Sequence, residues 1–525
     1  MYQTEVVVIG GGATGAGVLR DAAMRGFKTL LVERGDFGTG TSGRYHGLLH
    51  SGARYAVRDP VSARECIDEN RILRRIASAA IEDTGGLFVT TPDDDPSYAD
   101  KFVVACRQAG IPVEEISVAE ALRREPLLNP AIMRVFVVPD GSCEPWALID
   151  ANVRSAREFG GEAWNYHRVH GFERSNGRLD AVHVLDTRTG EEKTISCDFV
   201  INAAGAWAGQ IAAMAGPPVH MTAGKGSMIV MNHRLVNTVL NRCHMPSDGD
   251  ILVPVGTVCI IGTTSINVPD PDDYEIEPAE IDGMLAEGEK LIPGFSRTRS
   301  LRAYAGVRPL YSEHDVSSSQ GREVTRAYAV LQHSSRDGVE NFVSVVGGKL
   351  TTYRLMAQAG VDAMCDDLGV TRPCRTADEP LPGSENGRYD SIQRRLATIE
   401  TRGGAENALV CECEFVQRTQ VEHVALEKNT HDLNDIRREL RLGMGPCQGG
   451  FCTYRVGGIL HELRHLSPEV TNEALLRFLN ERWKGIKPVL WGDDLRQVQL
   501  DEEIYVNLLG VDRLERVRTR AQEPV

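Results

Sequence analysis

The sequence lacks any apolar run that approaches the roughly 18 residues needed to cross a bilayer, so we expect no membrane-spanning helix. The first residues, MYQTEVVVIGGG, have no basic segment ahead of the apolar stretch. We therefore expect no secretory signal peptide and a cytoplasmic location. Positive charge is also in deficit, because the formal net charge is −15. Such an acidic chain does not suit a nucleic-acid backbone as its main partner.

The chain has 525 residues of ordinary globular composition, without internal repeats or a low-complexity tract. This length exceeds what one hydrophobic core can organise, so we expect about two to four domains. Disulfides are not expected, because a chain without an export signal keeps its thiols reduced. Of the twelve cysteines, eight are scattered and are interpreted as buried free thiols. These eight are Cys66, Cys106, Cys143, Cys197, Cys243, Cys259, Cys365 and Cys374.

The segment TEVVVIGGGATGAGVLRDAAMRGFKTLLVER (4–34) predicts a dinucleotide-binding unit. A buried strand, a helix and a second strand follow one another, with G-x-G-x-x-G at Gly10, Gly12 and Gly15. These glycines allow a tight turn, approach to a pyrophosphate and close packing of helix on strand. Glu33 closes the second strand, where a carboxylate accepts hydrogen bonds from ribose hydroxyls. The fingerprint by itself does not separate FAD from NAD.

A second apolar run, CDFVINAAGAWA (197–208), ends in small residues. It is predicted to be a strand that reaches the cofactor through Ala203, Ala204 and Gly205. A plain core strand would have the same composition, so both interpretations stay open at this point.

Four cations lie in glycine- or aromatic-rich stretches, and guanidinium and ammonium groups suit phosphate oxygens. For each cation alone a surface salt bridge is the commoner role, and sequence spacing does not bring them together. The residues are Arg54 in LLHSGARY (48–55), Arg308 in AYAGVRPL (303–310), Arg326 in VTRAY (324–328) and Lys349 in VVGGKLTTYR (345–354).

The remaining four cysteines form two pairs, Cys411 and Cys413 in LVCECEF, and Cys447 and Cys452 in GMGPCQGGFC. Four thiolates are the ligand number of an iron–sulfur cluster or of a structural zinc. Glycines around the second pair leave backbone N–H groups for hydrogen bonds to sulfur. The C-x-C spacing fits zinc less well than the usual C-x2-C to C-x4-C pairs. The motif HELRH (461–465) matches a zinc-protease pattern, but no third ligand accompanies it, so we interpret it as a chance match.

The stretches GGGATGAG, HSGARY, GVRPL and GGKLTTYR together resemble the FAD-dependent glycerol-3-phosphate dehydrogenases of the D-amino-acid-oxidase-like superfamily. The resemblance covers the whole chain and is greatest to the catalytic A subunits of the anaerobic enzymes. It includes RPCRTAD (372–378) and FLNERWKGIKPVLWGD (478–493). It implies an α/β fold in which a Rossmann-like FAD domain is interleaved with a substrate domain built on an antiparallel sheet. A small bacterioferritin-associated-ferredoxin-like [2Fe-2S] domain would follow.

The resemblance also implies an activity: oxidation of sn-glycerol 3-phosphate to dihydroxyacetone phosphate in glycerol catabolism. Electrons would pass from FAD through the [2Fe-2S] cluster to partner B and C subunits and a quinone. The protein would then lie at the cytoplasmic face of the cell membrane as a peripheral protein.

Site residues carried over from the family fall into three groups. Arg54, Tyr55, Arg308, Arg326 and Lys349 would line the substrate pocket, with Arg308 and Lys349 polarising the reacting oxygen or the flavin. Gly347, Gly348 and Thr351 would approach the isoalloxazine, and Cys411, Cys413, Cys447 and Cys452 would hold the cluster rather than zinc. Aerobic relatives carry a histidine where this chain has Met228. The general base is therefore open, with His50 as a candidate.

The expected domains are an oxidoreductase body at 1–375, a linker at 376–405, a [2Fe-2S] domain at 406–462 and a helical tail at 463–525. Two other functions are considered. One is an FAD-dependent amine, opine or amino-acid dehydrogenase with a cluster domain, which would not need the cations. The other is a non-catalytic electron-relay or iron-handling protein, in which no substrate would bleach the flavin.

Overall fold

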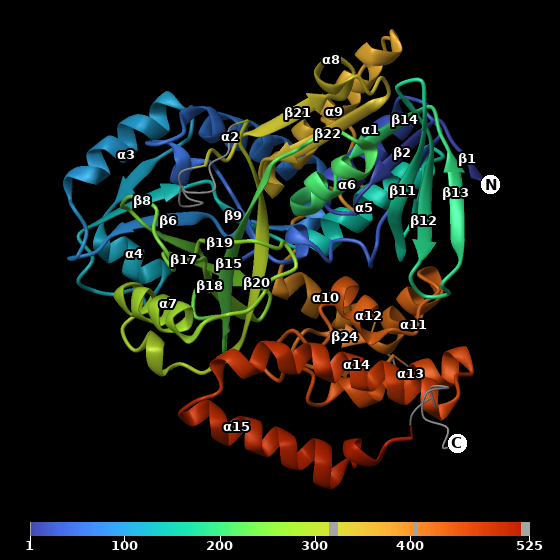
Figure 1. Cartoon of the computed structure of the whole chain (residues 1–525). Helices are drawn as coiled ribbons and strands as arrows, with labels where there is room; N and C mark the ends of the chain where they lie inside the picture. The colour runs from blue at the N-terminus through green and yellow to red at the C-terminus, as the bar shows by residue number, and fades with distance from the viewer. Residues whose placement is uncertain (1, 314–323, 403–406, 516–525) are drawn as a thin grey trace.

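The computed structural model describes residues 2–313, 324–402 and 407–515. Figure 1 shows a body made of two large sheets with their helices, and below it a mostly helical C-terminal part. Each large sheet is assembled from segments far apart in the sequence, which is the predicted interleaving.

The first large sheet has six strands in the order β10-β3-β2-β14-β22-β21. Its first five strands are parallel, and β21 is antiparallel to β22. The strands are β2 (Val6–Ile9), β3 (Thr29–Val32), β10 (Glu162–Trp164), β14 (Phe199–Asn202), β21 (Tyr328–Gln332) and β22 (Phe342–Gly347). Both faces of the sheet are covered, which explains why nearly all the residues of β2, β3 and β14 are apolar.

Alternate residues of β2 belong to two different cores. Val6 and Val8 pack under helices on one face, whereas Val7 and Ile9 pack on the other. The helices of the first face are α1 (Ala13–Met24), α2 (Pro60–Ile76), α5 (Pro145–Glu158) and α9 (Tyr353–Leu368). The second face is covered by α6 (Ala208–Ala215) and by a four-stranded sheet of β1 (Tyr2–Gln3), β11 (His167–Ser175), β12 (Arg178–Asp186) and β13 (Glu192–Ser196).

The second large sheet runs β19-β15-β18-β17-β16-β6-β8-β7, and β20 pairs with β15. All its pairings are antiparallel except β16 with β6. The strands are β6 (Gly86–Thr90), β7 (Glu114–Ile116), β8 (Arg134–Val138), β15 (Met221–Met231), β16 (Val239–Arg242), β17 (Ile251–Val255), β18 (Val258–Gly262), β19 (Ile266–Val268) and β20 (Ser300–Tyr311). This mainly antiparallel sheet agrees with the predicted fold class.

Short elements complete the body. The helices are α3 (Ser97–Gln108), α4 (Val118–Arg124), α7 (Pro278–Leu291) and α8 (His333–Asp337). The strands β4 (Leu48–Leu49), β9 (Gly141–Cys143) and β5 (Ile81–Glu82) form a small antiparallel sheet.

The C-terminal part has a core of its own around the four clustered cysteines. Its elements are α10 (Ile392–Arg402), β23 (Leu409–Cys411), β24 (Val416–Gln417), α11 (Arg418–Glu427), α12 (Leu433–Leu440), α13 (Cys452–Arg464), α14 (Pro468–Ile486) and α15 (Asp493–Glu502). Ala474 and Phe478 of α14 belong to that core, so the helix after residue 462 packs with the cysteine region. Val489 joins the core of the second large sheet instead. Within the described ranges, no helix has both the length and the apolar character to span a membrane.

Candidate flavin cavity and four-cysteine site

A cavity of about 1090 Å³ lies where β2, β3, β14 and β22 end, and residues of both large sheets line it. The carboxyl ends of parallel strands are where α/β sheets bind their ligands. With the exception of Gly15, every residue predicted to bind the cofactor or the substrate lines this cavity. The cofactor set is Gly10, Gly12, Glu33, Ala203, Ala204, Gly205, Gly347, Gly348 and Thr351, and the substrate set is Arg54, Tyr55, Arg308, Arg326 and Lys349.

The glycine fingerprint is shaped by close backbone contacts. Gly10 has a φ of +108°, and a Cβ on it would lie 2.6 Å from the carbonyl oxygen of Ala203. A Cβ on Gly15 would overlap the carbonyl oxygen of Gly10, so Gly15 allows α1 to pack against the end of β2. Gly12 precedes α1 and faces the cavity without a side chain. The bare N-terminus of α1 thus fits the pyrophosphate of FAD.

Glu33 follows β3 and is fixed by two backbone donors. Its carboxylate accepts hydrogen bonds from the N–H groups of Gly11 (2.7 Å) and Gly35 (2.9 Å). Burial raises the pKa of Glu33 above its ordinary value, and the two backbone donors oppose that shift. A carboxylate has about four acceptor positions, so Glu33 retains capacity for ribose hydroxyls.

A glycine pair after β22 forms another wall of the cavity. Gly347 and Gly348 have φ values of +75° and +74°, which L-residues with a side chain rarely adopt. A Cβ on Gly347 would lie 2.6 Å from the carbonyl oxygen of Ala327. The Thr351 hydroxyl accepts a hydrogen bond from the backbone N–H of His50 (3.2 Å), which joins this wall to the loop that carries Arg54 and Tyr55.

The predicted cations come together around the cavity, although they lie up to about 300 residues apart. Lys349 donates from Nζ to the carbonyl oxygen of Arg326 (2.8 Å), and Arg54 pairs with Asp250 (2.7 Å). Arg308 donates to backbone carbonyls, including that of Thr264 (2.8 Å). Within the described segments, Asp250 is the carboxylate in ion-pair contact with this set, so positive charge is in excess.

Two further observations fit an anionic ligand beside these cations. The Nη1 atom of Arg326 is buried and has no hydrogen-bond acceptor among the described residues. Burial, followed by the nearby charge of Arg326, lowers the pKa of Arg308 to about 9. A bound phosphate would supply both the missing acceptor and the missing negative charge.

Two histidines lie beside the cations, and the sequence analysis identified only His50. His46 also lines the cavity, and the rings of His46 and His50 are 6.1 Å apart. Burial, followed by neighbouring cations, lowers the pKa of His46 to about 3. Burial also holds the pKa of His50 well below its ordinary value, with His46 and Arg54 adding to the shift. The available signal for His46 was its place only four residues before His50, across the short strand β4 and Gly47, whose φ of +88° turns the chain.

The two histidines differ in their availability for proton transfer. Nδ1 of His46 accepts a hydrogen bond from the N–H of Leu48 (3.1 Å), so a neutral His46 carries its proton on Nε2. The ring of His50 has no hydrogen-bond partner in the part of the chain that the structure describes. Met228 is buried in an apolar cluster with Val230 and Ile260, away from the cavity lining.

The four clustered cysteines meet in the C-terminal part. The Cys411 and Cys413 sulfurs are 3.7 Å apart, those of Cys413 and Cys447 are 3.6 Å apart, and Cys452 lies close enough to Cys411 for each thiol to shift the pKa of the other. These distances are too long for disulfides. All twelve cysteines lie within the described ranges and all are free.

Backbone N–H groups point at the sulfurs, as the glycine-rich sequence predicts. The backbone N–H groups of Gly443 and Glu414 lower the pKa of Cys411, and those of Gly449 and Gly450 lower the pKa of Cys447, so these groups lie beside the two sulfurs. Interactions among the four thiols lower the pKa of Cys411 and Cys447 and raise that of Cys413 and Cys452, because one thiol of each pair holds the proton that the other accepts. A set of thiolates that receives N–H donors fits an iron–sulfur cluster.

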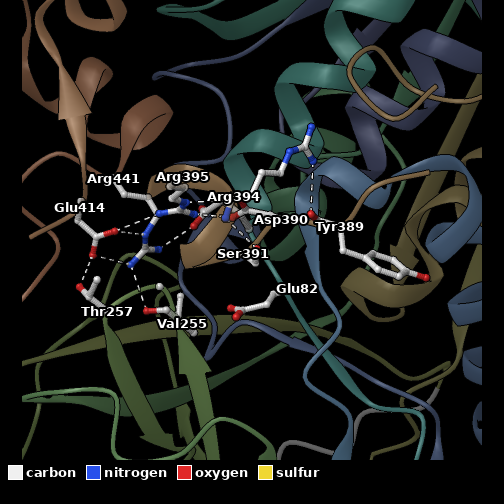
Figure 2. Close-up of polar contacts among 12 residues, drawn as sticks. Glu82, Val255, Thr257, Tyr389, Asp390, Ser391, Arg394, Arg395, Glu414 and Arg441 are labelled. Atoms are coloured by element: carbon white, nitrogen blue, oxygen red, sulfur yellow. Dashed lines mark hydrogen bonds and ion pairs between the residues drawn. The ribbon is translucent and has the colours of Figure 1, made fainter. Parts of the chain in front are cut away.

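Beside this site, a buried ion-pair network joins the C-terminal part to the body, as Figure 2 shows. Arg441 pairs with Glu414 (3.0 Å), which follows Cys413, and with Glu144 (2.7 Å) at the start of α5. Glu414 also accepts hydrogen bonds from Thr257 (2.9 Å) and Arg395 (3.3 Å). The segment that carries two of the four clustered cysteines, Cys411 and Cys413, is therefore joined directly to the oxidoreductase body.

The histidines of HELRH do not form a comparable group. His461 is exposed on α13, whereas His465 lies beyond the end of that helix with a φ of +49°. The regular one-turn spacing that a zinc-protease motif needs on one helix face is therefore interrupted.

Comparisons with known proteins agree with this geometry. The model of the FAD dependent oxidoreductase family matches residues 5–354, and that of the BFD-like [2Fe-2S] binding domain matches residues 409–462. Fold and site thus define a flavin-dependent oxidoreductase with an iron–sulfur domain. The predicted fold class and the two cofactors are confirmed.

Similar proteins of known name identify the family within this class of oxidoreductases. The A subunit of the anaerobic glycerol-3-phosphate dehydrogenase of Escherichia coli is 44% identical over 97% of this chain and 97% of its own. The A1 subunit of the anaerobic enzyme of Haloferax volcanii is 42% identical over 97% of this chain and 91% of its own. The chain belongs to the family of anaerobic glycerol-3-phosphate dehydrogenase A subunits. A solved glycerol-3-phosphate dehydrogenase from Bacillus halodurans, complexed with FAD, shares the fold, with a TM-score of 0.64 at 21% identity over 93% of this chain and 96% of that one.

Proposed function

We propose that this protein oxidises sn-glycerol 3-phosphate to dihydroxyacetone phosphate. The observation that carries the proposal is the excess of positive charge in the same cavity as the glycine fingerprint, with the buried Nη1 of Arg326 lacking an acceptor among the described residues. A phosphate oxygen would satisfy that atom. Relatives named as glycerol-3-phosphate dehydrogenases support the same substrate.

Each residue of the cavity has a proposed role. Arg54 and Arg326 bind the phosphate, and Tyr55, whose ring lies 5.3 Å from Nζ of Lys349, keeps that ammonium in place. His50 takes the proton of the C2 hydroxyl, because its low pKa leaves the imidazole neutral and able to accept. Arg308 and Lys349 stabilise the negative charge that develops on the C2 oxygen.

The cofactors would be held by the groups already described. FAD lies along the fingerprint, Glu33 and the Gly347–Gly348 wall, and when bound it supplies the acceptor for the hydride that leaves C2. Cys411, Cys413, Cys447 and Cys452 hold a [2Fe-2S] cluster, which supplies a one-electron carrier. Electrons then leave for partner B and C subunits and a quinone, a proposal supported by the names of the relatives, which are A subunits. We place the protein in the cytoplasm, peripheral to the cell membrane.

We also propose the domain division 1–375, 376–405, 406–462 and 463–525. Its support is the separate core of the cysteine region and the family match at 409–462. Because α14 contributes Phe478 to that core, the tail is expected to need the [2Fe-2S] domain for its own folding.

An anaerobic titration of the holoenzyme with sn-glycerol 3-phosphate tests the function. We expect bleaching of the flavin absorbance together with a rhombic EPR signal from a reduced [2Fe-2S] cluster. Bleaching without that signal contradicts the proposed electron route, and zinc instead of iron in the protein would explain it. Bleaching by an amino acid, with no response to glycerol 3-phosphate, contradicts the substrate. No bleaching by any substrate favours an electron-relay protein.

A matched pair of variants tests the phosphate site. Arg326→Met removes the guanidinium that lacks an acceptor, whereas Arg58→Met removes an exposed guanidinium at the wall of the same cavity. We expect a rise in KM of at least tenfold for Arg326→Met and less than threefold for Arg58→Met, on the order expected for loss of a charge-assisted hydrogen bond. Equal effects of the two substitutions contradict the assignment.

A further inference from the structure

Three buried arginines meet at the seam between the body and the C-terminal part. Arg302 comes from β20, Arg437 from α12 and Arg482 from α14, and their exposed fractions are 9%, 9% and 3%. The Nε atom of each is buried and has no hydrogen-bond acceptor in the described part of the chain. None of the three is in ion-pair contact with a carboxylate of the described residues.

The seam is built to admit these side chains. Gly485 of α14 lies against the guanidinium of Arg302, and a Cβ at that position would overlap it. The charged neighbours are Arg44, Arg438, Glu481 and Lys484. Glu481 offsets part of the positive charge without reaching ion-pair distance of the three arginines, and it pairs with Lys484 (3.7 Å). A guanidinium stays protonated in proteins, and a buried charge needs a counter-charge. The seam therefore retains a positive charge that the described side chains do not neutralise.

The place of Arg482 indicates where the counter-charge lies. Arg482 donates a hydrogen bond to the side chain of Gln448, which stands between the predicted ligands Cys447 and Cys452. The side chain of Gln448 is itself fixed by hydrogen bonds to the carbonyl oxygens of Met444 (3.2 Å) and Gly445 (2.9 Å). Arg482 is also close enough to Cys452 for their charges to interact.

A [2Fe-2S] cluster on four thiolates carries two negative charges when both irons are ferric, and three after it takes up one electron. Nearby positive charge stabilises the more negative form, and net charge around a cluster is one of the factors that set its potential.

We propose that Arg302, Arg437 and Arg482 are the buried counter-charge of the iron–sulfur cluster and raise its reduction potential, so that it accepts electrons more readily. This inference rests on the proposed ligation by the four cysteines, but not on the identity of the substrate. The three arginines act on the potential through space and are not cluster ligands.

A dithionite titration of the holoenzyme, monitored by EPR at known potentials, tests the proposal without substrate. The variants are Arg482→Met, Arg437→Met and the charge-retaining Arg482→Lys. The control is Arg455→Met, because Arg455 also interacts with Cys411 and Cys452 but is exposed and paired with Glu412.

The ratio of reduced to oxidised cluster is compared at one potential, the one at which the cluster of the unaltered protein is half reduced. We expect this ratio to fall at least tenfold in Arg482→Met and in Arg437→Met. For a one-electron couple a tenfold change is a shift of about 59 mV to lower potential. Arg482→Lys should stay within threefold of the unaltered protein, as should Arg455→Met, whose exposed charge is screened by solvent.

Three results overturn the proposal. The first is an unchanged ratio of reduced to oxidised cluster in Arg437→Met. Among the described residues, Arg437 has no hydrogen bond to the cysteine loop, so this variant still tests the proposal if Arg482→Met fails to bind iron. The second is a reduction potential that changes when phosphate is added but does not change when the arginines are substituted. A bound anion, and not the cluster, would then neutralise the arginines. The third is zinc in place of iron. Failure of glycerol 3-phosphate to reduce the flavin would leave the inference intact.

Discussion

Replacing Arg441 with methionine is expected to loosen the C-terminal part from the body. The side chains of Arg441, Glu414 and Glu144 are 7%, 0% and 13% exposed, so their ion pairs are buried. Removing one partner of such a pair leaves an uncompensated buried charge and costs about 3–5 kcal/mol. Here two carboxylates lose a partner, although Glu414 keeps its contacts with Thr257 and Arg395.

This cost should appear as faster local opening, because the network spans the seam of the two parts. At about 1.4 kcal/mol for each factor of ten, 3–5 kcal/mol corresponds to an increase of about 10² to 4 × 10³ in the rate of amide exchange. The assay is hydrogen–deuterium exchange of the holoenzyme, followed in peptides that cover β23, β24 and α12. Glu144→Gln in the Arg441→Met background removes one of the stranded charges, so it should recover part of the protection.

The matched control is Arg418→Met, at a position whose side chain is 36% exposed and pairs with Glu422 and Glu462. Surface pairs of this kind contribute about 0–1 kcal/mol, so exchange should rise less than about fivefold. If Arg441→Met and Arg418→Met raise exchange equally, the network in Figure 2 does not fasten the two parts.

Two other predictions concern the flavin cavity. The lowered pKa of His50 favours its neutral imidazole, so His50 should act as a base down to a pH well below 6.5. The pH profile of kcat/KM should therefore show no acid limb near pH 6.5. His50→Gln should reduce kcat by about 10²–10⁴-fold. If the unaltered enzyme shows an acid limb near pH 6.5 that is absent in His50→Gln, then His50 is not neutral at that pH, which contradicts the proposal. Gly15→Ala should lose FAD because its Cβ would overlap the carbonyl oxygen of Gly10, and a normal flavin content on purification would refute the packing role.

Local sequence patterns were sufficient to predict the dinucleotide-binding segment at 4–34 and the grouping of the four cysteines. In the segment 4–34 the strand, turn, helix and acid are consecutive, and their order alone fixes their geometry. Each cysteine pair is likewise local, and short glycine-rich spacing brings its N–H groups to the sulfurs. The ligand number of four also predicted that the two pairs come together, and in the fold Cys413 and Cys447 join them, with their sulfurs 3.6 Å apart.

Contacts between distant segments could not be read in the same way. Glu144 and Arg441 are both ordinary surface residue types, and nothing near either one predicts a buried pair. The sequence also does not predict that Nη1 of Arg326 lacks a hydrogen-bond acceptor among the described residues, because this depends on which side chains the fold places around it. The role of His46 was missed for a different reason: the turn at Gly47, with a φ of +88°, brings its ring beside His50 on the cavity wall, and the sequence does not specify that turn.

Strand β20 shows why the potential of the cluster and the binding of the substrate can be altered separately. Arg302 and Arg308 lie on this one strand, Arg302 at the seam with the C-terminal part and Arg308 at the cavity. Six residues at about 3.3 Å each place their Cα atoms roughly 20 Å apart. At that distance Coulomb's law gives about 0.2–0.8 kcal/mol for effective dielectric constants of about 80 to 20, so loss of the Arg302 charge should weaken phosphate binding by at most about fourfold. Substitutions at the seam should therefore shift the distribution of electrons far more than they change substrate affinity.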